Sequence, residues 1–241
     1  MTWITAALLG TASFSMVNII DSHLLAKRLP GVRTLLLPAG IIHLIYGSIS
    51  FYIFPLPEGI QLWPIVTMVA SSMFRSAAVF IILYNLKREE VSRVIPIVYT
   101  YPVFVAIMAM PLLGEILTYL HWLAIIIVVA GAVVISLERS PYSFSLRAGK
   151  PFLLLFVASL LLAVADITGK YALGYISSWN GFSISIICIA GMSLLFSLRP
   201  HVIKELRDMK QRNTALVLVT INETIAPVAM AFTIWATKHG P

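Results

Sequence analysis

Long apolar segments alternate with short polar gaps along almost the whole chain. A helix of roughly 20 residues, rising about 1.5 Å per residue, spans the ~30 Å hydrocarbon core of a bilayer, and each segment approaches that length. The gaps contain Pro, Gly or charged residues and leave no room for a soluble domain. The pattern predicts eight membrane-spanning helices, at Trp3–Leu25, Thr34–Phe54, Trp63–Leu86, Val94–Leu113, Ile116–Leu137, Pro151–Leu173, Phe182–Leu198 and Ala215–Trp235.

The composition indicates the same class of protein. Of the 241 residues, 59% are hydrophobic and 11% are charged, and the mean hydropathy of +0.94 is too high for a soluble domain with a polar exterior. We therefore expect an all-α membrane protein with the lipid bilayer as its surroundings. The net charge of +7 comes from basic residues clustered between apolar segments, which is typical of a topology signal, so we expect no nucleic-acid partner.

The basic residues lie in alternate gaps. They gather in segments 26–33, 87–93, 139–150 and 199–212, whereas the intervening gaps contain few Lys or Arg residues. Because successive gaps alternate between the two sides of a membrane, the four basic segments belong to one side. The positive-inside rule predicts that this side is the cytoplasm, which places the N-terminus outside the cell (inner) membrane.

The two halves of the chain carry a weak internal repeat. Asn18 in the first predicted helix aligns with Asp166 in the sixth, and Lys87 at the end of the third aligns with Lys238 near the end of the eighth. An offset of five helices inverts the second copy relative to the first, an arrangement that many transporters use.

The repeat divides the chain into two units. Residues 1–138 form a first repeat of five predicted helices, and residues 139–241 form a second repeat that stops after three. No segment of the second half corresponds to residues 94–137. We therefore expect a ten-helix (5+5) inverted-repeat bundle of which this sequence contains eight helices, the last two being lost by truncation.

A proline-rich segment and the helix after it resemble a known family. Pro96 and Pro102 are followed by Leu113-Gly114-Glu115 and by a helix that begins near Trp122. This order is similar to the EamA repeat of the drug/metabolite transporter superfamily. The segment of residues 166–172 is similar to the opening helix of that family's second repeat. The resemblance implies a ten-helix secondary transporter of small organic metabolites. It also implies two cytoplasmic termini, but we follow the charge pattern, which places the N-terminus outside.

Polar residues recur at helical spacing within five of the apolar segments. Spacings of three or four residues place these side chains on one helix face. Such a face is costly against lipid but can be hydrated and paired inside a bundle, so we expect the faces to line a central polar cavity. The sets are Thr11, Ser15, Asn18 and Ser22; His43, Tyr46 and Ser50; Thr67, Ser71 and Arg75; Ser159, Asp166 and Lys170; and Thr220, Glu223 and Pro227.

Four charged residues are the first candidates for a substrate or coupling-ion pathway. An ionised side chain near mid-helix costs about 2.5–3.5 kcal/mol on insertion scales, so Arg75 needs a partner or a ligand, and we expect Glu223 to be that partner. The pair either binds a charged substrate or a coupling proton, or holds helices together. Asp166 and Lys170 have the i, i+4 spacing of a helix-surface pair, and a structural role is favoured because Lys170 can reach the interface.

Four uncharged residues complete the candidate pathway. Asn18 and Asn222 are suited equally to hydrogen bonds between helices and to substrate contacts. His43 suits packing better than a proton relay, although histidine titrates in the range that a relay needs. Tyr99 lies between two prolines where a helix can bend, and we expect it to line the pathway or to flank a hinge.

These features together predict a secondary transporter. We expect it to move a small polar organic metabolite, amino-acid-like or drug-like, by alternating access and in the direction of efflux, with a proton as the candidate coupling ion. The alternative is a channel or a non-transporting membrane interaction protein, although a channel needs a continuous hydrophilic pore and a scaffold needs no buried charge. The sequence contains no His-Glu-x-x-His, Gly-x-Ser-x-Gly or phosphate-binding glycine motif, so we expect no enzyme, cofactor or metal site.

Overall fold

The computed structural model describes residues 1–114, 118–137, 150–209 and 211–240, and within these ranges the regular structure is helical throughout. The predicted all-α membrane fold is thus confirmed. The helices are α1 (Trp3–Lys27), α2 (Val32–Ile53), α3 (Leu62–Leu86), α4 (Val91–Val98), α5 (Tyr101–Leu113), α6 (Tyr119–Leu137), α7 (Lys150–Leu173), α8 (Ser178–Ser197), α9 (Pro200–Asp208) and α10 (Arg212–His239).

Seven spans in the described part of the chain are long and apolar enough to cross a membrane, when α4 and α5 are taken as one. The apolar stretch of α6, Tyr119–Gly131, is shorter. The eight predicted segments all coincide with helices, so the prediction is close. The prediction missed α9, a short helix that begins at Pro200. The composition of α9 is polar and lacks the long apolar run from which the other helices were predicted.

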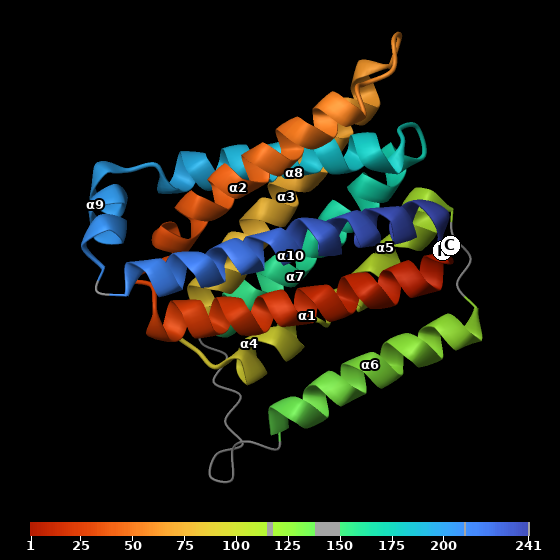
Figure 1. The fold of residues 1–241 in the computed structure, drawn as a ribbon. Helices are drawn as coiled ribbons and strands as arrows, with labels where there is room; N and C mark the ends of the chain where they lie inside the picture. The colour runs from red at the N-terminus through yellow and green to blue at the C-terminus, as the bar shows by residue number, and fades with distance from the viewer. Residues whose placement is uncertain (115–117, 138–149, 210, 241) are drawn as a thin grey trace.

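The helices run alternately up and down, so the gaps between them divide between two ends of the bundle. Figure 1 shows α9 and the first turns of α2 and α10 at the end where α1 finishes, and both chain termini at the other end. The described residues of the basic segments, such as Arg28, Lys87 and Arg207, lie at the first end, which we call the basic end. Segment 139–150 is outside the described residues apart from its last residue.

Three long helix pairs hold the bundle together: α3 with α7, α2 with α8, and α1 with α10. Each approach is close. A Cβ atom added to Gly47 of α2 would lie 2.5 Å from the side chain of Ile187 on α8, and one added to Gly10 of α1 would lie 2.7 Å from Thr233 on α10. Close contact between backbones is a common source of helix association in membranes, where hydrophobic burial provides little.

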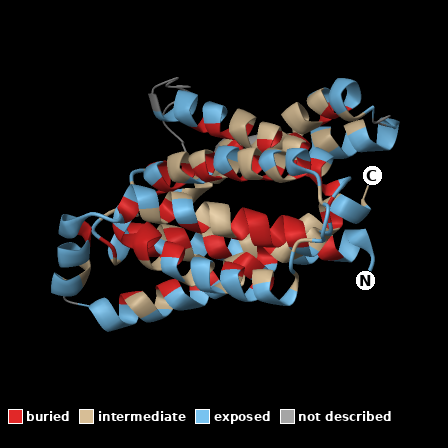
Figure 2. Cartoon of the chain, turned by 90° about the horizontal axis from the view of Figure 1, so that it is seen from above, coloured by how far each residue is buried: buried red, intermediate tan, exposed pale blue. Residues whose placement is uncertain are grey.

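Buried residues gather along the middle of the bundle, and exposed residues lie toward its outside (Figure 2). The outward side chains are largely apolar, as the 52% exposed Ile4, the 66% exposed Leu8 and the 54% exposed Ile45 illustrate. A soluble protein rarely exposes so much contiguous apolar surface. In a bilayer these side chains contact the acyl chains.

The fourth predicted segment is broken into α4 and α5 at Tyr99 and Thr100. Pro102 has no backbone N–H, so the carbonyl of Val98 loses its usual helical donor. The buried hydroxyl of Ser159 on α7 lies 3.3 Å from that oxygen and 3.2 Å from the carbonyl oxygen of Ile97. The same hydroxyl lies 3.0 Å from the carbonyl oxygen of Leu155 on its own helix, so its one proton is a donor that the break shares with α7.

Candidate functional site

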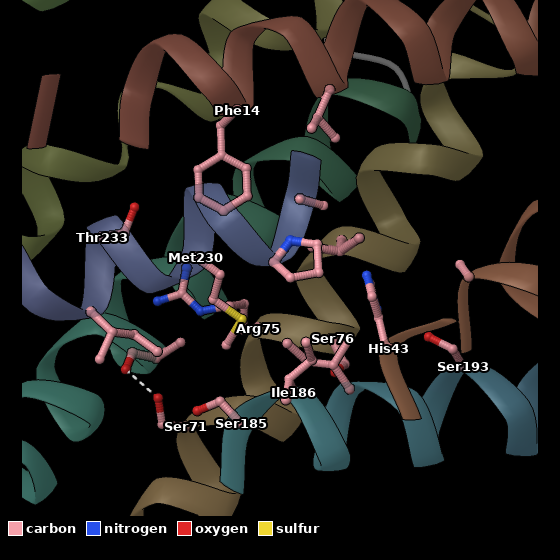
Figure 3. A pocket seen from close by; sticks show the side chains of 18 of the residues that line it. Phe14, His43, Ser71, Arg75, Ser76, Ser185, Ile186, Ser193, Met230 and Thr233 are labelled. Atoms are coloured by element: carbon pink, nitrogen blue, oxygen red, sulfur yellow. Dashed lines mark hydrogen bonds between the residues drawn. The ribbon is translucent and has the colours of Figure 1, made fainter. Parts of the chain in front are cut away.

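A cavity of about 190 Å³ lies inside the bundle and is lined by α1, α2, α3, α7, α8 and α10. Most of its wall is apolar, and Figure 3 shows Phe14, Ile186 and Met230 grouped around the side chain of Arg75. Apolar walls lower the local dielectric constant, so the few charged groups among them interact strongly with one another.

Arg75 on α3 forms an ion pair with Asp166 on α7. Its Nη2 atom lies 2.5 Å from Oδ1 of the carboxylate, and the two side chains are 28% and 26% exposed. The expectation that Glu223 would be the partner of Arg75 is therefore wrong. The reason is the order of the helices, because α3 packs along α7 while α10 packs along α1. One turn before Arg75, the hydroxyl of Ser71 donates to the carbonyl oxygen of Ala165 at 2.7 Å.

The break between α4 and α5 brings two tyrosines to the same region. The hydroxyl of Tyr99 interacts with the side chain of Asn18, which lines the cavity. The rings of Tyr99 and Tyr101 are 6.3 Å apart, and Tyr101 lies within electrostatic range of Arg75 and Asp166. Tyr101 thus lies near the ion pair, and neither tyrosine is among the residues that line the cavity.

A second polar cluster joins α1, α2 and α10. The side-chain amide nitrogen of the fully buried Asn222 donates to Oδ1 of Asp21 at 2.8 Å and to Oε1 of Glu223 at 3.3 Å. On the other side of Glu223, Nε2 of His43 lies 3.0 Å from Oε2 without the alignment of a hydrogen bond. Both carboxylates and the histidine line the cavity, and Asn222 lies behind them.

The structure brings the sequence-predicted residues to one place. Tyr99 and Asn222 lie directly behind the wall of the cavity, in contact with lining side chains. The carboxylate of Asp166 is engaged by Arg75, and Lys170 lies one turn further along α7. The predicted residues that line the cavity are Asn18, His43, Arg75, Asp166, Lys170 and Glu223. That they contact a substrate or a coupling ion stays a prediction.

Six polar lining residues were missed by the sequence reasoning, namely Asp21, Ser76, Ser185, Ser193, Thr233 and Thr237. Asp21 follows Asn18 by three residues on the same face of α1, and this spacing is the signal that identifies it. Ser185 and Ser193 of α8 also line the cavity. They lie eight residues apart, a spacing that returns to nearly the same face of a helix, but serine is too common in membrane helices for the pair to stand out.

Some of the predicted polar faces point elsewhere. Thr11, Ser15 and Thr220 are exposed on the outside of the bundle. The hydroxyl of Ser15 donates to the carbonyl oxygen of Thr11 at 2.9 Å, and that of Thr220 to the carbonyl oxygen of Leu216 at the same distance. A hydroxyl that bonds to its own helix four residues back tolerates a lipid-facing position. The prediction that these residues line the cavity is therefore wrong.

The described residues contain no group of three or more His, Cys, Asp and Glu side chains placed to hold a metal ion. Glu115, which carries much of the family resemblance, lies outside the described residues together with the first two positions of the fifth predicted segment.

Comparison with family models gives a match over the first part of the chain. Residues 1–137 match the model of the EamA-like transporter family, which covers more than half of the chain. No curated protein matches the sequence.

Proposed function

Because the chain belongs to the EamA-like transporter family of the drug/metabolite transporter superfamily, we propose that it carries a small polar organic solute across a membrane by alternating access. The observation that carries this proposal is the cavity inside the bundle. It is walled by both halves of the chain, and an ion pair and a carboxylate cluster face each other across apolar surface.

The size and chemistry of the cavity favour an amino-acid-like solute. Its volume of about 190 Å³ is below the roughly 300–1,000 Å³ of sites for drug-sized ligands. Arg75 offers a planar fork of donors to a carboxylate, and Asp166 offers an acceptor to an ammonium group. A zwitterionic solute can exchange its own charges for those of the ion pair, while its side chain packs against Phe14 and Met230.

Two lysines support the inverted repeat on which alternating access depends. At the basic end, Nζ of Lys87, which follows α3, donates to the carbonyl oxygens of Leu25 at 2.5 Å and Leu29 at 2.8 Å. At the opposite end, Nζ of Lys238 on α10 donates to the carbonyl oxygens of Leu173, at 3.1 Å, and Ile176. Each lysine thus holds the C-terminus of a long helix, α1 in one half and α7 in the other.

The helix contacts support the same division into residues 1–138 and 139–241. Exchanging α1 with α7, α2 with α8 and α3 with α10 converts the α3–α7 contact into the α10–α1 contact, and it leaves the α2–α8 contact unchanged. We propose that the two halves rock against each other around the cavity, with the basic end in the cytoplasm and the net movement outward.

Transport by the purified protein in proteoliposomes tests the proposal. A panel of amino acids, sugars and cationic drugs identifies the solute class, and we expect uptake of leucine or a similar small zwitterion. Arg75→Ala and Asp166→Ala should each reduce uptake at least tenfold. The matched control is Arg93→Ala, since Arg93 is an exposed arginine whose side chain is outside the cavity. Unchanged uptake in the first two variants would show that the ion pair is not part of the binding site.

A further inference from the structure

We propose that Asp21 and Glu223 share one bound proton, with Asn222 bridging them, and that this proton drives the transport proposed above. The inference deepens that function and rests on it for its coupling role. Binding of the proton itself rests on the geometry of the cluster alone.

Repulsion between two carboxylates is the first argument for the proton. Asp21 and Glu223 are 8% and 6% exposed, and both accept a hydrogen bond from the side-chain amide nitrogen of Asn222, so they lie close together in a buried place. Two ionised carboxylates that share a buried site repel each other, and one proton on the pair removes that repulsion. Nε2 of His43 lies 3.0 Å from Oε2 of Glu223, and the guanidinium of Arg75 is engaged by Asp166.

The hydrogen-bond inventory is the second argument. The amide nitrogen of Asn222 is shared between the two carboxylates, and its amide oxygen, also fully buried, has no donor among the described residues. Pro227 has no N–H, so the carbonyl oxygen of Glu223 lacks its helical donor as well. The cluster thus contains an excess of acceptors. An acidic O–H group is the smallest donor that can reduce this excess.

The same inventory favours a proton over a metal cation. Hard divalent cations such as Ca²⁺ take six or more oxygen ligands, with Mg²⁺ demanding near-octahedral geometry. Here one oxygen of each carboxylate already accepts a hydrogen bond from Asn222. The described residues provide no metal-binding group of three or more His, Cys, Asp and Glu side chains.

The charged groups that surround the cluster come from three neighbouring helices. α2 contributes His43, α3 contributes Arg75, and α7 contributes Asp166 and Lys170. α8 contributes only serines and apolar side chains to the wall. Loss of the proton from Asp21 or Glu223 therefore changes the field at the Arg75–Asp166 pair. This gives the proton a means of influencing solute binding across the same cavity.

The coupling step is a simple proton transfer. When the cavity opens to the side of higher proton concentration, a hydronium ion gives its proton to the ionised carboxylate pair and leaves as water. When the cavity opens to the other side, the carboxylic acid returns the proton to water. No other bond forms or breaks in this step.

Infrared spectroscopy of the full chain in lipid tests proton binding without any solute. We expect a carboxylic acid C=O band at neutral pH, where an isolated carboxylate in water is ionised. Asp21→Asn should remove it, because the remaining carboxylate then has no like charge beside it, and Glu223→Gln is the second variant should the first not fold. The control Glu205→Gln removes an exposed carboxylate on α9. Absence of the band in the unmodified protein, or its persistence in both cluster variants, overturns the proton site.

Leucine transport in proteoliposomes then tests coupling. A gradient of about one pH unit should accumulate leucine about tenfold on the acidic side if one proton is exchanged for each molecule, because each pH unit is worth about 1.4 kcal/mol. In Asp21→Asn or Glu223→Gln the accumulation ratio should fall to about one. Leucine exchange without any response to the pH gradient overturns coupling. Absence of leucine exchange together with the carboxylic acid band contradicts the proposed function but leaves the proton site standing.

Discussion

Replacement of Lys87 by methionine is expected to free the end of α1 from the end of α3, a movement within the first half of the chain, and so to open the cavity toward the basic end. The lysine donates two hydrogen bonds to carbonyl oxygens at the end of α1, at 2.5 and 2.8 Å, and methionine keeps the length of the side chain but removes both. A hydrogen bond to a charged group contributes about 1.5–3 kcal/mol, and a cation at a helix C-terminus adds about 0.3–1 kcal/mol. Because Lys87 is only half-buried, we take the low end.

A loss of about 2 kcal/mol changes the ratio of closed to open forms about thirtyfold. Lys238→Met should act in the opposite direction and open the other end, with a smaller effect because Lys238 is exposed. Both effects follow from the positions of the two lysines at opposite ends of the bundle.

Maleimide labelling of single cysteines measures the opening at each end. Cys188 is the one native cysteine, so a Cys188→Ser background accepts a reporter at Ser193 near the basic end or at Thr237 near the other. Lys87→Met should accelerate labelling of Ser193→Cys and leave Thr237→Cys slow, and Lys238→Met should do the reverse.

The control for the first variant is Arg88→Met. Arg88 is the neighbouring basic residue, and its guanidinium lies 4.1 Å from the ring centre of Tyr84 rather than on the end of α1. If Lys87→Met and Lys238→Met accelerate the same reporter, or if neither changes any rate, the two lysines do not hold opposite ends closed.

Two further predictions concern stability. In the Arg75–Asp166 pair, Arg75→Met or Asp166→Asn leaves one partner's charge without its counterion, and the two side chains are 28% and 26% exposed, so each variant should destabilise the protein by about 1–3 kcal/mol, whereas the double variant should recover much of that loss in a thermal-unfolding cycle. Strictly additive losses would contradict a direct pair. Gly47→Ala should lower the melting temperature, because its Cβ would lie 2.5 Å from Ile187 and overpacking costs about 1–3 kcal/mol, while Gly191→Ala, with no atom within 4 Å, should not.

Apolar length was enough to predict the membrane helices, and polar spacing predicted part of the polar lining of the cavity. A membrane helix needs a long apolar run, so it can be predicted from its own segment of the sequence. The inward direction of polar residues such as Asn18 and Glu223 can be predicted in the same way, because a polar side chain that faces lipid would cost free energy. Both predictions needed information from one segment at a time.

The pairing of the charged residues required more than one segment. Arg75 had two carboxylates at comparable depth, and the choice between Asp166 and Glu223 depends on which helix packs along α3. Periodicity does not contain that information. Asp21 was missed for a related reason, since a carboxylate six residues before the end of α1 is ordinarily solvated, and its burial arises from contact with α10.

Under the proposed repeat, the two halves place different residues at matched positions. In the register that aligns Asn18 with Asp166 and Lys87 with Lys238, Asp21 aligns with Gly169 and Asn222 aligns with Ser71. At these matched positions a Cβ atom on Gly169 would lie 2.9 Å from the hydroxyl of Ser71, so this contact between α7 and α3 is tight. The matched contact between α1 and α10 is the hydrogen bond from Asn222 to Asp21.

This asymmetry explains how the proposed transporter divides its tasks. The Ser71–Gly169 contact lets α3 and α7 approach closely beside the Arg75–Asp166 pair, where we place solute recognition. The Asp21–Asn222 contact introduces a carboxylate at the equivalent place, where we place the proton. An inverted pair of halves can rock symmetrically only if their packing is similar, yet coupling requires the two sites to differ. Different residues at the matched positions of one repeated helix contact meet both requirements, because the packing stays similar while the two sites differ in chemistry.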